Sequence, residues 1–460
     1  MPSQTGTPAQ TPIWSSRFVA YLATIGAAVG LGSVWRLPYL VGTSGGSAFL
    51  LIFVLACLAI ATPLLVAEFA LGRRSRLSPP DAAGAVAVES GGSRNWNAIG
   101  IVGTIACFAI TTYYMVVAGW VLAYTWKCAS GALVGLDRPA VAAHFQALLA
   151  NPFELVAWQL AFIAIVAFTS ARGVGRGVEL ATRWRAPMLL ILLIGLAGYA
   201  LATGDVRAGL AFAFAPNFAA ITPQVLVAAV GQAFFATGVG MAMMLAYGAY
   251  LPRGTSLVRS ALGITGSILL VSLLATLMIF PLVFRYGMNP AGGPELVFGV
   301  LATVFAEMPG GRIVGTLFFV LLFLSAFTPS LAAYEPMVAW LQQSKGASRR
   351  RAVAIVAVAV WAVGLGTVLS FNRWSGWFPL GFLPTFATKT FFDVLDYVAS
   401  NLLLPLGALA TSLLVGWRLR RDILAEELAE TTPGAARLCI WLLRYACPLA
   451  LAAVLISTLL

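Results

Sequence analysis

The sequence predicts an all-α protein that crosses a membrane many times. Of its 460 residues, 60% are hydrophobic and only 10% are charged, whereas soluble proteins carry about 25% charged residues. Apolar runs such as 48–65, 264–284 and 351–370 have the length that a helix needs to cross the hydrocarbon core of a bilayer. The ~10-residue alternating segments of a membrane β-barrel do not occur.

Apolar runs separated by turn residues predict eleven spans. The predicted spans are 17–40, 46–71, 97–126, 154–171, 184–202, 222–249, 258–285, 312–342, 350–370, 391–416 and 437–459. The chain, 1–460, is expected to form one transmembrane domain. Its first repeat covers about 17–202, its second repeat about 222–416, and an additional span lies at about 437–459.

Basic residues mark one side of the membrane. The net charge of +12 would suit a nucleic-acid-binding protein, but the basic residues are clustered in alternate loops, as in the cytoplasmic loops of membrane proteins. The clusters are Arg73, Arg74 and Arg76; Arg172, Arg176, Arg183 and Arg185; Lys345, Arg349, Arg350 and Arg351; and Arg418, Arg420 and Arg421. We therefore expect a cytoplasmic N-terminus, a lipid bilayer as partner and no nucleic acid. The five cysteines lack metal-ligand spacing and are expected to be free, buried thiols.

Two spans are interrupted at matching places in the two repeats. Residues 25–39, IGAAVGLGSVWRLPY, contain three glycines, an arginine and a proline; relative to alanine, glycine costs a helix about 1 kcal/mol and proline about 3. The sixth predicted span carries Gly238 and Gly240 within GQAFFATGVGM. A single glycine motif more often marks close helix packing, but breaks in corresponding spans are typical of inverted-repeat transporters.

Unwound backbone inside a membrane must find polar partners, because each unsatisfied group costs several kcal/mol in hydrocarbon. The N-terminal end of a half-helix presents N–H groups to an anion, and freed carbonyl groups attract a small cation. The paired breaks therefore predict a site at the middle of the membrane for an anion or a zwitterion, together with Na⁺.

Several motifs carry a family resemblance. AAVGLGSVWRLPYLVGTSGGSAFL, PLLVAEFALGR, YYMVVAGW, GQAFF, SAFTPSLAAYEPMVAWL and FFDVLDY follow one another in the chain. They resemble the successive spans of the neurotransmitter:sodium symporter family, whose bacterial members import amino acids, over about residues 14–416. The resemblance implies a 5+5 inverted-repeat fold with broken spans one and six, alternating access, and the cell membrane, a bacterial inner membrane, as location.

The resemblance also implies roles for individual residues. Tyr114 would bind the substrate carboxylate, Phe235 would be an aromatic lid, and Arg36 and Asp396 would form an outer gate, linked directly or through water. Tyr250 would lie at the cytoplasmic gate, and Glu68 would support the unwound region. The implied substrate-binding residues are Ala27, Ala28, Gly30, Gly32, Ile110, Tyr114, Phe234, Phe235, Gly238, Met241 and Ala333. From the residues alone, Tyr114 fits a membrane-interface belt as well, and Arg36 fits a side chain that reaches the membrane surface.

Two sodium positions follow from the resemblance, and both have lost ligands. Sodium position one comprises Gly26, Val29, Ser325 and Thr328. Sodium position two comprises Ala28, Ser33, Ala236 and Ser267. In position one, Pro329 replaces a hydroxyl residue; in position two, Ser33 and Ala236 replace an asparagine and a threonine. We expect position one to bind Na⁺ better than position two.

The cytoplasmic gate departs from the family pattern as well. Thr11 and Gln343 stand where the family has a basic residue and its acidic partner. Losing both charges leaves no unpaired buried charge, so a different means of closing this side is expected.

We interpret the chain as a secondary active transporter that imports a neutral, hydrophobic or aromatic amino acid with Na⁺, without another cofactor, as a monomer or a homodimer. Gly238 and Ala333 are small enough to widen an apolar pocket for a bulky side chain. A proton-coupled or sodium-independent carrier, with Glu68 as proton relay, and a substrate-binding receptor that does not transport remain alternatives. An enzyme is not expected, because the one histidine and 16 acidic residues form no catalytic cluster.

Overall fold

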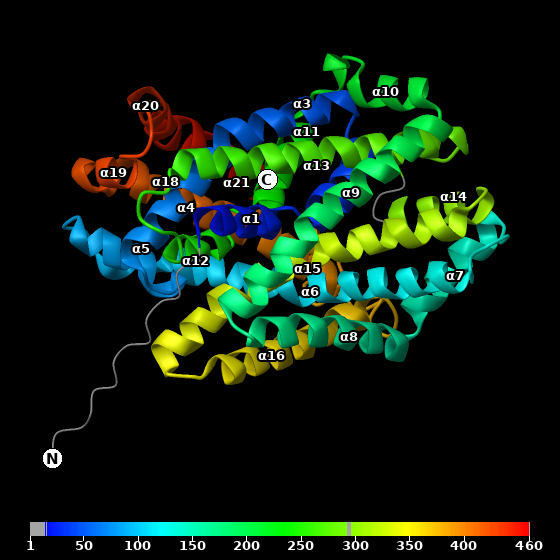
Figure 1. Cartoon of the computed structure of the whole chain (residues 1–460), viewed down its shortest axis with the longest axis horizontal. Coiled ribbons are helices and arrows are strands. Elements are labelled where there is room, and N and C mark those ends of the chain that lie inside the picture. The colour runs from blue at the N-terminus through cyan, green and yellow to red at the C-terminus, as the bar shows by residue number, and fades with distance from the viewer. Residues whose placement is uncertain (1–13, 15, 292–295, 460) are drawn as a thin grey trace.

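The computed structural model describes residues 14, 16–291 and 296–459, and the regular structure within these residues is helical. The long helices run in roughly one direction, and short helices lie at both ends of the bundle (Figure 1). Among the described residues, nine helices are long and apolar enough to cross a membrane, and a tenth span is formed if the bent pair α1 and α2 is counted as one. The prediction of a polytopic, all-α membrane protein is confirmed.

The helices follow the predicted spans to within a few residues. The first half contains α1 (Arg17–Ala28) with α2 (Leu37–Thr43), α3 (Ser47–Ala56) with α4 (Thr62–Ser75), α6 (Ala98–Ser130), α8 (Pro152–Ala171) and α9 (Leu180–Thr203). The second half contains α11 (Pro223–Thr237) with α12 (Met243–Ala249), α13 (Leu257–Arg285), α15 (Gly311–Lys345), α16 (Arg349–Ser370), and α17 (Phe391–Tyr397) with α18 (Leu404–Leu413). The additional span consists of α20 (Pro433–Trp441) and α21 (Cys447–Leu459).

Both predicted breaks are present. Helix α1 ends where Val29 turns to an extended conformation (φ −76°, ψ 93°), and the next helical segment, 32–43, is bent by 46° relative to α1. Helix α11 ends at Gly238, and Gly238, Gly240 and Ala242 have φ of 69°, 82° and 57°. Glycine adopts this left-handed region without the steric cost that a side chain brings. A Cβ on Gly240 would also lie 2.6 Å from the carbonyl oxygen of Leu404, so this turn needs glycine for space as well.

Two buried side chains tie the breaks into the bundle. Nε2 of Gln232 on α11 donates a hydrogen bond of 2.7 Å to the carbonyl oxygen of Gly32 in the first break. Oε1 of Glu68 on α4 accepts one of 2.7 Å from the backbone N–H of Gly240 in the second. The Gly240 N–H, which the second break removes from helical bonding, is thus satisfied by a neighbouring helix, as hydrocarbon surroundings require. The Gly32 carbonyl also accepts the N–H of Leu37 in the helical segment that follows the first break.

The two ends of the bundle have different short helices. Helices α5 (Pro79–Glu89) and α19 (Arg421–Glu427) lie at one end, here called the α5 face, and α7 (Arg138–Ala150), α10 (Val206–Phe214) and α14 (Ala302–Glu307) lie at the other, the α7 face (Figure 1). At the α5 face, Arg74 pairs with Glu89 and with Glu426, each at 2.5 Å. Hydrogen bonds from Arg74 hold the pKa of Glu89 below its ordinary value.

The packed interior lies where α6 and α15 run side by side (Figure 1). All five cysteines are free and buried, as predicted. Two arginines of the basic clusters are buried within helices: Arg73 in α4 is 7% exposed and Arg185 in α9 is 4% exposed. The sequence predicted Arg185 at the edge of a span that begins at 184, but the helix begins at Leu180, so Arg185 lies in its second turn.

Candidate functional site

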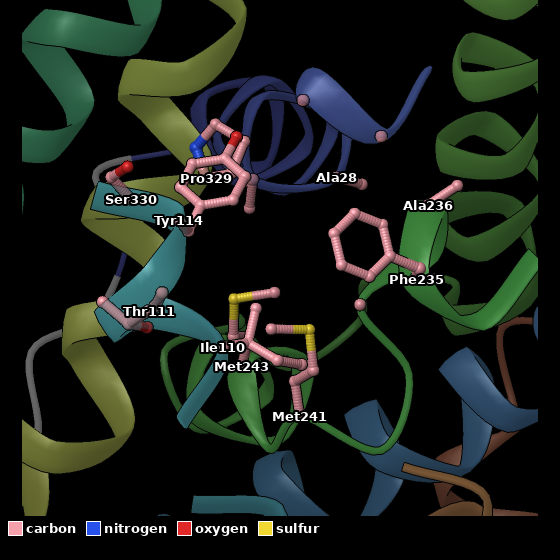
Figure 2. A pocket seen from close by; sticks show the side chains of 15 residues that line it. Ala28, Ile110, Thr111, Tyr114, Phe235, Ala236, Met241, Met243, Pro329 and Ser330 are labelled. Atoms are coloured by element: carbon pink, nitrogen blue, oxygen red, sulfur yellow. The ribbon is translucent and has the colours of Figure 1, made fainter. Parts of the chain in front are cut away.

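A small cavity lies between the two breaks, α6 and α15. All the predicted substrate-site residues line it except Phe234. Thr111, Ala236, Met243, Pro329 and Ser330 complete the lining. In Figure 2, the rings of Tyr114 and Phe235 enter the cavity from different sides, and Met241 and Met243 lie together at one end.

Phe234 lies outside this cavity. Its side chain is 1% exposed and packed in the core, and its carbonyl oxygen accepts the N–H of Gly238 at 2.8 Å as α11 ends. Successive residues of a helix point about 100° apart because a turn contains 3.6 residues, so the side chains of Phe234 and Phe235 face different surroundings. The resemblance implies a role for Phe234 through its backbone and for Phe235 through its ring, so the buried Phe234 side chain does not bear on that expectation.

Polar groups are concentrated at one part of the cavity wall. The hydroxyl of Tyr114 on α6 accepts a hydrogen bond of 3.4 Å from the N–H of Leu31, at the start of the segment that continues the first span. The hydroxyls of Thr111 and Ser330 donate to carbonyls of their own helices, at Cys107 and Ala326. The free polar groups that the wall offers therefore come mainly from Tyr114 and the broken backbone, and the rest of the wall is apolar.

A second, wider cavity of about 1200 Å³ lies toward the α7 face. Tyr114 and Phe235 line both cavities and therefore lie between them. The guanidinium of Arg36 lies 4.2 Å from the centre of the Phe235 ring, a distance at which a cation–π attraction forms. This layer of side chains separates the inner cavity from the wider one.

The predicted outer gate residues line this wider cavity without touching. The carboxylate of Asp396 accepts hydrogen bonds from the hydroxyls of Tyr113, at 2.7 Å, and Ser400, at 2.9 Å. Among the described residues, Arg36 and Asp396 are not joined by an ion pair, although both border the same space.

At the α5 face, a network of buried polar side chains closes the bundle. Glu335 on α15 forms an ion pair with Arg349 at the start of α16. The hydroxyl of Tyr250 donates to Glu335 at 3.1 Å, and Nε of Arg349 donates to the carbonyl of Ser170 at 2.7 Å. The backbone N–H of Trp14 donates to the carbonyl of Tyr250 at 3.1 Å. The network thus connects α8, α15, α16 and the segment after α12 with the N-terminal segment.

Sequence reasoning placed Tyr250 at this face but missed Glu335 and Arg349. The sequence did contain a signal for this ion pair: Glu335 is an acidic residue within a long apolar span, and the basic cluster with Arg349 follows that span. Gln343, which stands where the family has an acid, accepts the N–H of Ser78 at 2.6 Å instead. Thr11 lies outside the described residues.

Sodium position one lies where α1, α9 and α15 meet. A Cβ on Gly26 would be 3.0 Å from Cγ2 of Thr328, and the Thr328 hydroxyl is buried without a hydrogen-bond partner among the described residues. The ligand expected from Ser325 is its carbonyl oxygen; its hydroxyl donates to the carbonyl of Leu322. The carbonyl oxygen of Val29 accepts a hydrogen bond of 3.3 Å from Nη2 of Arg185. A cationic side chain therefore already contacts one of the predicted sodium ligands.

Three of the four residues of sodium position two lie at the breaks. Ala28 and Ala236 line the inner cavity, and the buried hydroxyl of Ser33 has no hydrogen-bond partner among the described residues. Ser267 is half-buried on α13, and its hydroxyl donates to the carbonyl of Gly263 on the same helix. The polar residue that the resemblance suggested is thus engaged within its own helix.

The match to known proteins covers nearly the whole chain. A model of the Sodium:neurotransmitter symporter family matches residues 11–135 and 142–460. The chain belongs to this family. The family consists of transporters and not enzymes, and the chain is a multi-pass membrane protein of this sodium-dependent class.

Individual relatives agree with this assignment. The chain is 36% identical over 452 residues to the uncharacterized sodium-dependent transporter YhdH of Bacillus subtilis, covering 97% of this chain and 98% of that protein. The crystal structure of MhsT in complex with L-phenylalanine superposes with a TM-score of 0.88 at 34% identity, covering 97% of this chain and 99% of MhsT. The sodium-dependent neutral amino acid transporter B(0)AT2 of Bos taurus is 27% identical over 299 residues, which cover 58% of this chain and 40% of that protein.

Proposed function

We propose that this transporter carries a neutral amino acid with a bulky hydrophobic or aromatic side chain into the cell, together with Na⁺. The observation that carries the proposal is the composition of the inner cavity wall: its polar groups lie at Tyr114 and the broken backbone, and apolar side chains form the remainder. The complex of MhsT with L-phenylalanine and the neutral amino acid named for B(0)AT2 support the same class of substrate.

The substrate carboxylate would bind at the polar part of the wall. The Leu31 N–H and the Tyr114 hydroxyl are 3.4 Å apart, so a carboxylate oxygen placed beside both receives two hydrogen bonds. The positive end of the half-helix that starts here adds a favourable field for an anion. The substrate ammonium group would face carbonyl groups that the breaks leave free of helical bonds.

The substrate side chain would occupy the apolar part of the cavity. Ile110, Met241, Met243 and Phe235 border this space, and the small side chain of Ala333 also lines it. Methionine side chains adapt to ligands of different shape and contact aromatic rings favourably. A charged side chain would lose its hydration here without finding a partner, which costs several kcal/mol, so charged amino acids are excluded.

Transport would proceed by alternating access, with the α7 face outside and the α5 face in the cytoplasm. Loops after α4, α8 and α15 carry basic clusters and lie at the α5 face, which agrees with the positive-inside rule. The wide cavity beside Arg36 and Asp396 would be the entrance. The Glu335–Arg349 pair, Tyr250 and Trp14 would keep the exit closed in this arrangement.

The proposal is tested by uptake into proteoliposomes of a panel of twenty labelled amino acids, with an inward Na⁺ gradient or with choline in place of Na⁺. We expect accumulation of aromatic and large aliphatic amino acids only with the gradient. Uptake of lysine or aspartate, or binding without any flux, would contradict the proposal. Equal uptake with choline would remove Na⁺ coupling and leave the proton-coupled alternative.

Substitution of Glu68 tests the proton-coupled alternative directly. Oε1 of Glu68 accepts the Gly240 N–H at 2.7 Å, a contact that supports a structural role for the side chain at the second break. Glu68→Gln keeps an oxygen acceptor but has no titratable group, so uptake should persist in this variant with its ion dependence unchanged. If uptake by the wild type follows a proton gradient and the variant loses this response, Glu68 is a proton relay.

A further inference from the structure

Arg185 brings a permanent positive charge to the first break. Its guanidinium Nη2 lies 3.3 Å from the carbonyl oxygen of Val29, and the residue is 4% exposed. Nε and Nη1 have no hydrogen-bond partner among the described residues. A guanidinium group remains protonated in proteins, so a full charge is buried at this point.

The end of α1 explains why the charge is tolerated there. The last carbonyl groups of a helix have no partner within it and carry about half a negative charge in total. Helix α1 ends at Ala28, and the extended conformation of Val29 turns away from the helix. The negative helix end that would attract Na⁺ therefore attracts the guanidinium group in the same way.

The oxygen ligands of sodium position one are also reduced in number. Val29 already accepts the hydrogen bond from Arg185, and Pro329 has no hydroxyl. The Thr328 hydroxyl is buried without a partner among the described residues. Arg185 and Thr328 therefore both keep buried polar atoms without partners among the described residues.

Electrostatic repulsion acts against a second cation at this position. Two unit charges ~4 Å apart in surroundings with an effective dielectric constant of about 20 repel each other enough to weaken binding about a thousandfold. A sodium ion coordinated by the Val29 carbonyl would share this oxygen with the guanidinium group, whose Nη2 lies 3.3 Å from it. Na⁺ and Arg185 therefore exclude each other here.

We propose that Arg185 is a built-in cation that takes the place of Na⁺ at the position formed by Gly26, Val29 and Thr328. The proposal rests on the proposed function as a transporter, and it reverses the expectation that position one is the better sodium site. The chain then binds at most one Na⁺, at the position that includes Ala28, Ser33 and Ala236. The fixed charge would bridge α1 and α9 throughout the transport cycle.

Two other roles for Arg185 fit the structure less well. A direct ligand of the substrate would line the inner cavity, but Arg185 does not; the backbone of the first break lies between. An arginine that reaches the membrane surface keeps its charged end in water, whereas this residue is almost fully buried.

The test measures equilibrium binding of radioactive Na⁺ to purified protein in the absence of substrate. We compare the wild type with Arg185→Ala combined with Pro329→Ser, which removes the fixed charge and restores a hydroxyl. The double variant should bind one more Na⁺ per chain than the wild type. Arg183→Ala combined with Pro329→Ser is the matched control, because Arg183 is an exposed arginine of the same helix. It should bind the same number of ions as the wild type.

Thr328→Val decides whether the additional ion binds at the expected place. In the double variant it should abolish binding of the additional Na⁺, and in the wild type it should leave Na⁺ affinity within twofold. A tenfold or larger loss of Na⁺ affinity on Thr328→Val in the wild type would overturn the proposal, because Na⁺ would then bind beside Arg185. This arm remains decisive if the double variant does not fold. Equal Na⁺ numbers in the wild type and a monodisperse double variant would also overturn it.

Failure of the assignment of Arg185 and failure of the proposed function give different results in these assays. Sodium binding is measured without an amino acid, so a wrong substrate class would leave the ion count interpretable. Arg185→Lys, which keeps the charge, should behave like the wild type in the same assay. Failure of all amino acid uptake would contradict the proposed function while leaving the assignment of Arg185 intact.

Discussion

The carboxylate of Glu335 and the guanidinium of Arg349 form an ion pair at the α5 face, between α15 and α16. The Glu335 side chain is 1% exposed and the Arg349 side chain 15%. Tyr250 donates to the same carboxylate at 3.1 Å, and Arg349 also holds the end of α8 through Ser170. Gln343, eight residues after Glu335 on α15, is uncharged where the resemblance implies an acidic residue.

Removing one member of this pair should open the α5 face. Either Glu335→Gln or Arg349→Gln leaves an uncompensated buried charge, which costs about 3–5 kcal/mol. We expect faster hydrogen–deuterium exchange in α12 and in the segment around Trp14, measured by mass spectrometry. The double variant Glu335→Gln with Arg349→Gln removes both charges. Its exchange rate in these segments should be closer to that of the wild type than the rate of either single variant. Additive effects in the double variant would show that the two side chains act independently.

Tyr114→Phe should weaken substrate binding without affecting the fold. A hydrogen bond to a charged group contributes about 1.5–3 kcal/mol, so loss of the hydroxyl should raise the dissociation constant by about 10-fold or more. Binding is measured by scintillation proximity with the best substrate of the uptake panel. Tyr124→Phe is the matched control, because this hydroxyl on the same helix has no hydrogen-bond partner among the described residues. Equal affinities for the two variants would remove Tyr114 from the proposed site.

Ala333→Leu should change which side chains are accepted. Ala333 lines the inner cavity, and the added atoms would occupy space proposed for the substrate side chain. One methylene in an apolar pocket changes discrimination about 10-fold to 200-fold, so competition assays should show preference moving from aromatic amino acids to alanine and valine. A folded variant with unchanged preference for aromatic substrates would place the substrate side chain elsewhere.

Glu89 should make a small contribution to stability that depends on pH. Hydrogen bonds from Arg74 lower the pKa of Glu89, so the contribution is present above the unfolded-state pKa of about 4.3 and is lost as pH falls through the folded-state pKa. The Glu89 side chain is 43% exposed, and such pairs contribute less than about 1 kcal/mol. The midpoint temperature of thermal unfolding of Glu89→Gln should therefore be slightly below that of the wild type at pH 7. At acidic pH the two midpoints should be equal. A difference that grows as pH falls would contradict this assignment.

Features that depend on local chemistry were predictable from the sequence. Hydropathy gave the positions of the spans, because each spanning helix must cover about 30 Å of hydrocarbon whatever its neighbours are. Glycine and proline gave both breaks, because their backbone preferences act at the residue itself. The motifs around these breaks also carried the resemblance to the family, and the helical structure and its match to MhsT confirm the fold.

Features that depend on how the helices face one another required the tertiary structure. Phe234 and Phe235 differ by one position, yet only Phe235 lines the inner cavity, because the rotation of α11 decides which side chain points inward. Arg185 and Val29 are far apart in the chain and meet only because α9 packs beside the end of α1. The sequence determined where the helices break. The packing of the helices decided which charges lie at the breaks, since a buried charge is stable only where the fold supplies its partner.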